Sequence, residues 1–318
     1  MLKTETRLIP FRGNGPYCYS NTASMLLSTI DEQVSPQELE AYTGVGLGAF
    51  WLQHEKLLFF SSISNPPDIG ISRALRVLGF GFEEKASDNA EEPPLEQLRS
   101  DLSTSAALLG PLDMGYLTHN PLHARMSGAD HYVLAYRFEK DGVLIHDPEG
   151  FPSVVLPIRQ LELAWKAENI GYRRGYYRYW THPRRLGRPS RVELYNSTVR
   201  SFKEVYNDSQ ALSAKQNWII DIQAINTLAK HVKNGKVSPA ERGFMVFFSF
   251  KLGARRALDF ASFFGSRHPE LAGFKEKQAE LFGSMQAFAV QRKWGRVADS
   301  LEQFAQVETE FRSALMSA

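Results

Sequence analysis

Three residues whose side chains can together perform nucleophilic acyl chemistry occur in this chain: Cys18, His131 and Asp147. Cys18 follows the turn-forming segment Arg12-Gly13-Asn14-Gly15-Pro16-Tyr17 and precedes an apolar stretch with helical spacing. A thiol at the first turn of a helix lies near the positive end of the helix dipole, which favours the thiolate. The position of Cys18 therefore predicts a nucleophile.

His131 and Asp147 are candidates for the base and for the group that orients it. Residues 131–138 and 142–146 have strand-like patterns, and the Asp-Gly pair between them is typical of a hairpin turn. Neighbouring strands would let Asp147 fix one tautomer of the His131 imidazole while the other ring nitrogen faces Cys18. The Cys18 backbone N–H and the Asn14 side-chain amide would then stabilise an oxyanion.

Each of these residues also has an ordinary structural interpretation. A lone Cys is more often a small buried apolar residue than a nucleophile. A His beside an Asp is often a satisfied structural pair, and Asp147-Pro148-Glu149-Gly150 is also an ordinary turn sequence. The hypothesis of a Cys-His-Asp triad depends on finding all three residues in a suitable order and in strand context.

The elements around these residues predict an α+β fold in two domains. Strand patterns and short helices alternate up to about residue 185, and an antiparallel sheet is expected to pack against the Cys18 helix. From about Val192 onward the apolar spacing is helical. Gly187 and Pro189 mark the break. We therefore expect a catalytic domain over residues 1–190 and an all-helical domain over residues 191–318.

Composition excludes several classes of protein. The chain has 318 residues, of which 43% are apolar and 23% charged, so wholesale disorder is excluded. A net charge of +2 excludes a histone-like polycation, and a single Cys excludes an internal disulfide and a multi-Cys zinc site. No apolar run predicts a transmembrane helix or a signal peptide, so a cytoplasmic location is expected.

Two segments resemble a known superfamily. Residues 128–136 and 141–148 resemble the His and Asp strands of papain-like cysteine peptidases of the bacteriocin-leader type. The N-terminal domain of the butirosin biosynthesis protein H family is a closer resemblance, over about residues 10–180. The shared features are an N-terminal Cys followed by a helix, a segment that runs into a Gly-rich loop (Ser35 to Gly48), and Gly110-Pro111-Leu112-Asp113-Met114-Gly115-Tyr116-Leu117-Thr118-His119.

The resemblance implies a papain-like first domain and an acyltransferase of natural-product biosynthesis. Such a protein takes an acyl group from a carrier-protein thioester onto its Cys and passes it to a small-molecule amine. The resemblance implies no bound cofactor, although the donor can carry phosphopantetheine. The chain departs from the related peptidases, which place a Gln shortly before the Cys where Arg12 and Asn14 stand here.

Two other functions stay open on the sequence. A cysteine peptidase or amidase would use the same three residues with water as the acceptor, and a non-catalytic binding module would keep the fold without the chemistry. We expect four further residues to contact the substrate: Tyr17, Gly46, Tyr116 and His119. The sequence leaves the oligomeric state open, with a homodimer among the alternatives.

The stretch from Tyr172 to Arg191 contains seven Arg and no acidic residue, with Tyr and Trp between them. It suits a packed strand with a solvated linker, or a docking face for an acidic carrier protein or an anion. Single-stranded nucleic acid is a third partner for such a pattern, but the near-neutral net charge argues against it. His119 and His123 lie close in sequence, but without Cys ligands or an H-E-x-x-H motif no metal site is predicted.

Overall fold

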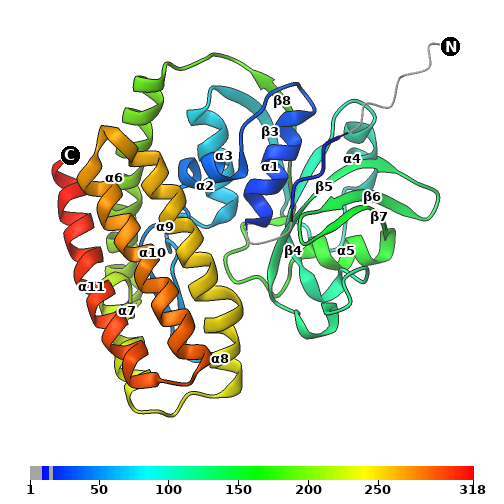
Figure 1. The fold of residues 1–318 in the computed structure, drawn as a ribbon. Coiled ribbons are helices and arrows are strands. Elements are labelled where there is room, and N and C mark those ends of the chain that lie inside the picture. Colours follow the sequence, from blue (N-terminus) through cyan, green and yellow to red (C-terminus); the bar gives the residue numbers. More distant parts are fainter. Residues whose placement is uncertain (1–8, 14–16) are drawn as a thin grey trace. The chain divides into compact units, whose positions relative to one another are not determined.

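The computed structural model describes residues 9–13 and 17–318 of the chain (Figure 1). These residues form two compact units. The first, here called the sheet unit, consists of the described residues of Met1–Leu39 together with Ile71–Pro189, and the second, the helical unit, consists of Glu40–Gly70 and Ser190–Ala318. An antiparallel sheet in one unit and a helical bundle in the other confirm the α+β class.

The sheet unit is built on a six-stranded antiparallel sheet with the order β3-β8-β4-β5-β6-β7. The hairpin expected at 139–142 joins β5 to β6, with the Glu139 N–H donating to the Gly142 carbonyl at 2.8 Å. The strand bounds are β3 Phe80–Ser87, β4 Ala107–Asp113, β5 Asp130–Phe138, β6 Gly142–Asp147, β7 Phe151–Pro157 and β8 Tyr176–Arg185.

Helices pack on this sheet and enclose its core. Helix α1 (Cys18–Ser28) packs mainly against β5, and its buried face includes Met25 and Leu26 (Figure 1). Helix α5 (Ile158–Lys166) buries Trp165 against the strands, and the Trp165 indole N–H donates to the Arg178 carbonyl at 2.8 Å. Helix α4 (Leu95–Leu102) buries Leu98 in the same core as Trp165 of α5. Two further helices, α2 (Pro36–Thr43) and α3 (Pro67–Val77), contain the points where the chain passes between the units.

The helical unit contains the remaining helices and one short hairpin, β1 (Phe50–Leu52) with β2 (Leu57–Phe59). The capping box at Ser238 and Glu241 is formed, with Pro239 in the first turn, as expected for this sequence pattern. The helix bounds are α6 Arg191–Gln216, α7 Asp221–Lys233, α8 Pro239–Phe244, α9 Phe250–Phe264, α10 Pro269–Val290 and α11 Trp294–Ser317, with a π-helical turn at Met245–Ser249 between α8 and α9.

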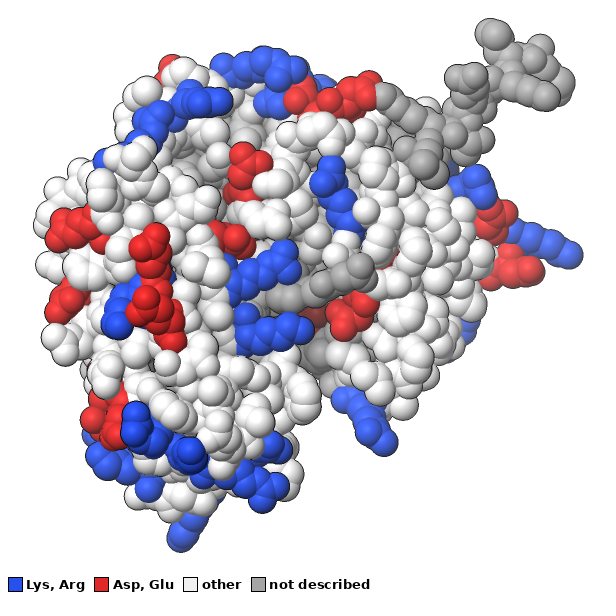
Figure 2. Space-filling view, in the orientation of Figure 1, with Lys and Arg blue, Asp and Glu red and all other residues white. Residues whose placement is uncertain are grey.

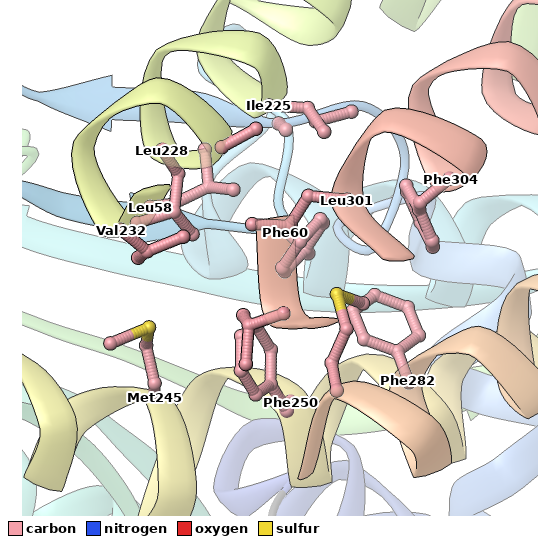
Figure 3. Close-up of a cluster of buried hydrophobic side chains, with 14 of the residues drawn as sticks. Leu58, Phe60, Ile225, Leu228, Val232, Met245, Phe250, Phe282, Leu301 and Phe304 are labelled. Atoms are coloured by element: carbon pink, nitrogen blue, oxygen red, sulfur yellow. The ribbon is translucent and has the colours of Figure 1, made fainter. Parts of the chain in front are cut away.

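The structure differs from the expected division of the chain at residues 40–70. The sequence analysis assigns this segment to residues 1–190, but it lies in the helical unit. Figure 3 shows Leu58 and Phe60 of the segment among Phe250, Phe282 and Phe304 of the helices, in one buried core. Between α2 and α3 this segment forms only the short strands β1 and β2, and several of its side chains are buried by helices far along the chain. The two units therefore do not divide at a single boundary near residue 190.

No helix among the residues that the structure describes is long and apolar enough to cross a membrane.

Candidate active site

Cys18 is the first residue of α1 and is partly exposed. The residue before it, Tyr17, is buried and has a left-handed backbone with φ 82° and ψ 42°. A bulky residue rarely adopts this conformation, and such strain persists only where surrounding contacts impose it. Two donors of Asn21, the backbone N–H at 2.8 Å and the side-chain amide at 3.0 Å, bind the Tyr17 carbonyl. The turn that presents the thiol is therefore fixed from inside α1.

Thr22 connects the first turn of α1 to the strand that carries His131. Its hydroxyl lies 2.7 Å from the Cys18 carbonyl and 3.1 Å from the carbonyl of Tyr132, the residue after His131. The Tyr19 and Tyr132 rings meet edge to face, with centroids 6.0 Å apart. These contacts hold the start of α1 against the start of β5, where the candidate base lies.

The strand register brings His131 and Asp147 together. Leu134 pairs with His146 across β5 and β6, so extending the register makes His131 and Asp147 diagonal neighbours on one face of the sheet. His131 Nε2 donates to Asp147 Oδ1 at 2.6 Å, and the Glu149 backbone N–H donates to the same oxygen at 2.8 Å. Both side chains are almost fully buried.

The environment sets the charges of this pair. Burial disfavours an ionised Asp147, but the charge of His131 and the hydrogen bonds from His119, His131 and Glu149 outweigh it and hold the pKa of Asp147 well below its usual range. Burial likewise opposes a charged His131, but Asp147 and the hydrogen bond with Cys18 raise the pKa of His131 well above its ordinary value. The buried pair is therefore an imidazolium and a carboxylate at neutral pH.

The thiol lies against this ion pair. Because Nε2 of His131 bonds Asp147, the ring nitrogen left for the hydrogen bond with Cys18 is Nδ1. Burial raises the pKa of Cys18, and the charge of Asp130 adds to this rise. The hydrogen bond and the charge of His131 lower it again without cancelling the rise. Cys18 therefore keeps its proton at neutral pH, next to an imidazolium that would stabilise the thiolate once it forms.

A second histidine, His119, binds the other oxygen of Asp147, with its Nε2 2.7 Å from Oδ2. From the sequence, His119 is predicted to contact the substrate, and no hydrogen bond with Asp147 is predicted. Its position after the strand that ends at Asp113 gives no local sign of this contact, because the rest of its loop and the whole of β5 lie between it and β6 in the sequence. Only a search for every His near the predicted triad could have suggested it.

The other predicted substrate contacts lie in different surroundings. Tyr116 ends a short 3₁₀ turn and packs partly buried against the core of the sheet unit. Gly46 lies in the helical unit, where an added Cβ would be 2.8 Å from Arg256 Cδ and 3.0 Å from the Phe260 ring. Gly46 and Cys18 therefore belong to different units. The predicted oxyanion residue Asn14 lies outside the described residues.

The Gly-Pro-x-Asp segment before His131 has a clear structural role that the sequence analysis did not assign. Asp113 is fully buried and accepts hydrogen bonds from the Gly115 N–H at 2.9 Å, the Gly128 N–H at 3.0 Å and the Asn169 amide at 3.1 Å. It therefore ties together both ends of the loop that contains His119. A Cβ at Gly110 would lie 2.2 Å from the Tyr132 ring, so only glycine allows this close approach.

The basic stretch from Tyr172 to Arg191 is largely occupied by internal contacts. Trp180 and Tyr179 are buried, and Arg185 forms two hydrogen bonds with Glu32, at 3.0 and 2.6 Å.

Figure 2 shows another gathering of Lys and Arg on the helical unit, where α7 leads to α8 and α10 leads to α11. The exposed Lys and Arg residues at these two helix connections are Lys230, Lys233, Lys236, Arg292, Lys293 and Arg296.

The residues that the structure describes contain no group of three or more His, Cys, Asp or Glu side chains placed to hold a metal ion.

Comparison with known proteins gives one relative of full length. The chain is 38% identical to the uncharacterized protein YobF of Bacillus subtilis strain 168 over 309 residues, which covers 97% of this chain and 99% of the relative. Residues 215–316, which lie within the helical unit, match the YobF C-terminal domain family. The chain therefore belongs to the YobF family.

Proposed function

We propose that this protein is a cysteine-dependent acyltransferase, with a sheet unit of papain-like arrangement, that acts in the cytoplasm. The observation that carries the proposal is a partly exposed thiol at the N-terminus of α1, hydrogen-bonded to an imidazole that a buried carboxylate orients. A nucleophile, a base and an orienting acid in this order are what acyl transfer through a covalent intermediate requires.

In the first half-reaction, Cys18 Sγ attacks the carbonyl carbon of an acyl thioester. For this step His131 must first release its own proton to solvent; the neutral imidazole then takes the thiol proton as Sγ attacks and gives it to the sulfur of the leaving thiol as the donor C–S bond breaks. Cys18 then carries the acyl group. The Cys18 backbone N–H at the start of α1 is one donor for the oxyanion, and the Asn14 amide is proposed as the second.

In the second half-reaction, the nitrogen of an amine attacks the acyl carbon. His131 accepts a proton from that nitrogen, the bond to Cys18 Sγ breaks, and the thiol is restored as the amide leaves. Asp147 keeps its proton-free, hydrogen-bonded state and stabilises the charged His131 throughout. The donor is proposed to be a phosphopantetheine thioester on an acidic carrier protein and the acceptor a small-molecule amine. Water in place of the amine would make the same site a hydrolase.

The first experiment measures the intact mass of the protein after incubation with a panel of acyl thioesters. Cys18 is the only Cys in the chain, so a mass gain that is absent in Cys18→Ser identifies an acyl-Cys18 species. His131→Ala should slow its formation by about a hundredfold or more, because the base is lost. Adding amines should then yield an amide, whereas release as the free acid would favour the hydrolase.

One result would contradict both catalytic functions. If no donor acylates the protein, and iodoacetamide alkylates Cys18 only after denaturation, the thiol is structural and a binding module becomes the better interpretation. His123→Ala is the matched control for His131→Ala, because His123 bonds the Gly115 carbonyl at 2.9 Å in the neighbouring loop without contacting Asp147.

A further inference from the structure

Asp147 has hydrogen-bond donors on both of its oxygens. His131 Nε2 and the Glu149 N–H bind Oδ1 at 2.6 and 2.8 Å, and His119 Nε2 binds Oδ2 at 2.7 Å. The carboxylate is fully buried, so these donors stand in for solvent. A Cys-His-Asp triad needs only the contact between Asp147 and His131. The second histidine is therefore an additional feature of this site that needs its own explanation.

The surroundings of His119 fix how its ring meets Asp147. The Asp147 carboxylate can only accept a hydrogen bond, so Nε2 of His119 is the donor. Its Nδ1 is buried and has no hydrogen-bond partner among the described residues, and the side chain is 10% exposed. The Phe151 ring, edge to face with a centroid distance of 5.4 Å, fixes the imidazole plane.

We propose that His119 is a positioning residue that acts on His131 through Asp147: its Nε2–H holds the second carboxylate oxygen and thereby lets His131 release its proton more readily. The consequence of this positioning for acyl transfer rests on the proposed function. The hydrogen bond between His119 and Asp147 does not depend on it.

The direction of the effect follows from the charges around the pair. Asp147 raises the pKa of His131, and Cys18 on α1 also acts on His131, while the charge of Asp130, the residue before His131, acts on Cys18. A donor on Oδ2 stabilises the carboxylate most when His131 is neutral, because the carboxylate then has no cation beside it. Without His119, the neutral state of His131 loses more stabilisation than the charged state, so the imidazolium would hold its proton to a higher pH.

Two variants at one position separate this role from packing. His119→Gln keeps an N–H donor at about the position of Nε2, and His119→Leu fills similar space without a donor. The pH titration of His131 is followed by NMR on protein labelled in its histidine rings, with His131→Gln identifying the signal. In His119→Leu we expect His131 to bind its proton about threefold or more tightly, whereas His119→Gln should stay near the unaltered protein.

His123→Leu is the matched control, since it removes a histidine hydrogen bond from the same loop without touching Asp147. Circular dichroism checks that each variant folds. If His119→Leu does not fold, His119→Phe, which keeps a ring without the donor, replaces it. If His131 titrates alike in the unaltered protein and in the variant without a donor, the proposal is overturned and His119 is a packing residue or a substrate contact.

The same variants keep the inference distinct from the proposed function. If thioesters acylate Cys18, the acidic limb of the pH profile should move to higher pH in His119→Leu but not in His119→Gln. If no thioester reacts while the His131 titration moves as expected, the positioning role stands and acyl transfer is contradicted. A lower affinity for the amine in both variants, with an unchanged His131 titration, would show that His119 contacts the acceptor and would also overturn the proposal.

Discussion

Both units of this protein bury charged side chains, but the two clusters differ in what surrounds them. In the sheet unit, Asp147 binds two histidines and the cluster adjoins the partly exposed thiol of Cys18. In the helical unit, Arg256 donates from Nε to Glu40 at 2.8 Å and from Nη1 to the Phe60 carbonyl at 2.8 Å. The first cluster adjoins a thiol, and the second joins segments of the fold that are far apart in the sequence.

A second cluster in the helical unit shows the same closed character. Glu308 accepts hydrogen bonds from Tyr206 and Gln278, both at 2.6 Å, and pairs with the buried Lys275 at 3.6 Å. The cavity beside it has a volume of about 20 Å³, which is room for about one water molecule. Buried charge alone is therefore no sign of catalysis. What distinguishes the sheet unit is a partly exposed thiol beside the ion pair and a His119 ring nitrogen that has no partner among the described residues.

The largest effect on stability is expected in the helical unit. Arg256→Leu should lower the free energy of unfolding by about 3–5 kcal/mol, because it removes the positive charge that lies 2.8 Å from the fully buried Glu40. Urea denaturation followed by circular dichroism measures the loss. Lys277→Ala breaks an exposed pair with Glu280 and should cost less than about 1 kcal/mol. Equal losses in the two variants would contradict a structural role for the Arg256–Glu40 pair.

The two units should also respond oppositely to pH. Burial, with the charge of Glu308 adding to it, raises the pKa of Asp221 in the helical unit from 3.8 to about 6. The folded protein holds this proton to a higher pH than the unfolded chain, so the contribution of Asp221 to stability falls between about pH 4 and pH 6. A rise of this size corresponds to about 3 kcal/mol. The depressed pKa of Asp147 has the opposite effect on stability. The contribution of Asp147 to the free energy of unfolding is present above about pH 4 and is lost in stronger acid.

Asp221→Asn tests this contrast. Relative to the unaltered protein, the variant should gain up to about 3 kcal/mol in free energy of unfolding as the pH rises from 4 to 7, as measured by urea denaturation at several pH values. Asn keeps an oxygen for the Ala49 N–H, which donates to Asp221 at 3.2 Å, so that local bond is retained. A difference between variant and unaltered protein that does not change with pH would show that Asp221 stays ionised throughout.

A smaller effect, on reactivity rather than on stability, is expected in the sheet unit. Asp147→Asn removes the charge that raises the pKa of His131, so the pKa of His131 should fall. A smaller fraction of His131 would then be charged beside Cys18. Alkylation of Cys18 by iodoacetamide at pH 7, followed by intact mass, should slow about tenfold, which corresponds to about 1.4 kcal/mol. Asp101→Asn is the control, because Asp101 pairs with Lys85 in the same unit. If iodoacetamide alkylates Cys18 at the same rate in Asp147→Asn and Asp101→Asn, the charge of Asp147 has no special effect on the thiol, and the contrast between the two kinds of buried charge cluster is lost.

Local sequence patterns determined most of the elements. The apolar spacing of residues 158–166 predicts a short helix, and α5 is found there; the hairpin between β5 and β6 follows its Asp-Gly signal. The capping box at Ser238 and Glu241 also forms as its spacing predicts. These features depend on hydrogen bonds and side-chain contacts within a few residues, so the sequence of one segment is enough to specify them.

The proposed triad depends partly on local sequence patterns and partly on tertiary packing. Its residue types and strand context were visible in the sequence, and the hairpin register then placed His131 beside Asp147. The contact of Cys18 with His131, however, spans more than a hundred residues and depends on how α1 packs against β5. Thr22, which bonds the Tyr132 carbonyl, fixes that packing without any signal in the sequence.

Only the tertiary structure determines which residues far apart in the sequence meet in a buried charged cluster. His119 reaches Asp147 from a loop that Asp113 holds, and Glu40 meets Arg256 from 216 residues away. The placement of residues 40–70 in the helical unit is of the same kind. Such contacts leave no period or spacing in the local sequence, because they arise only when separate segments pack together and each buried polar atom must find a partner in the space that remains.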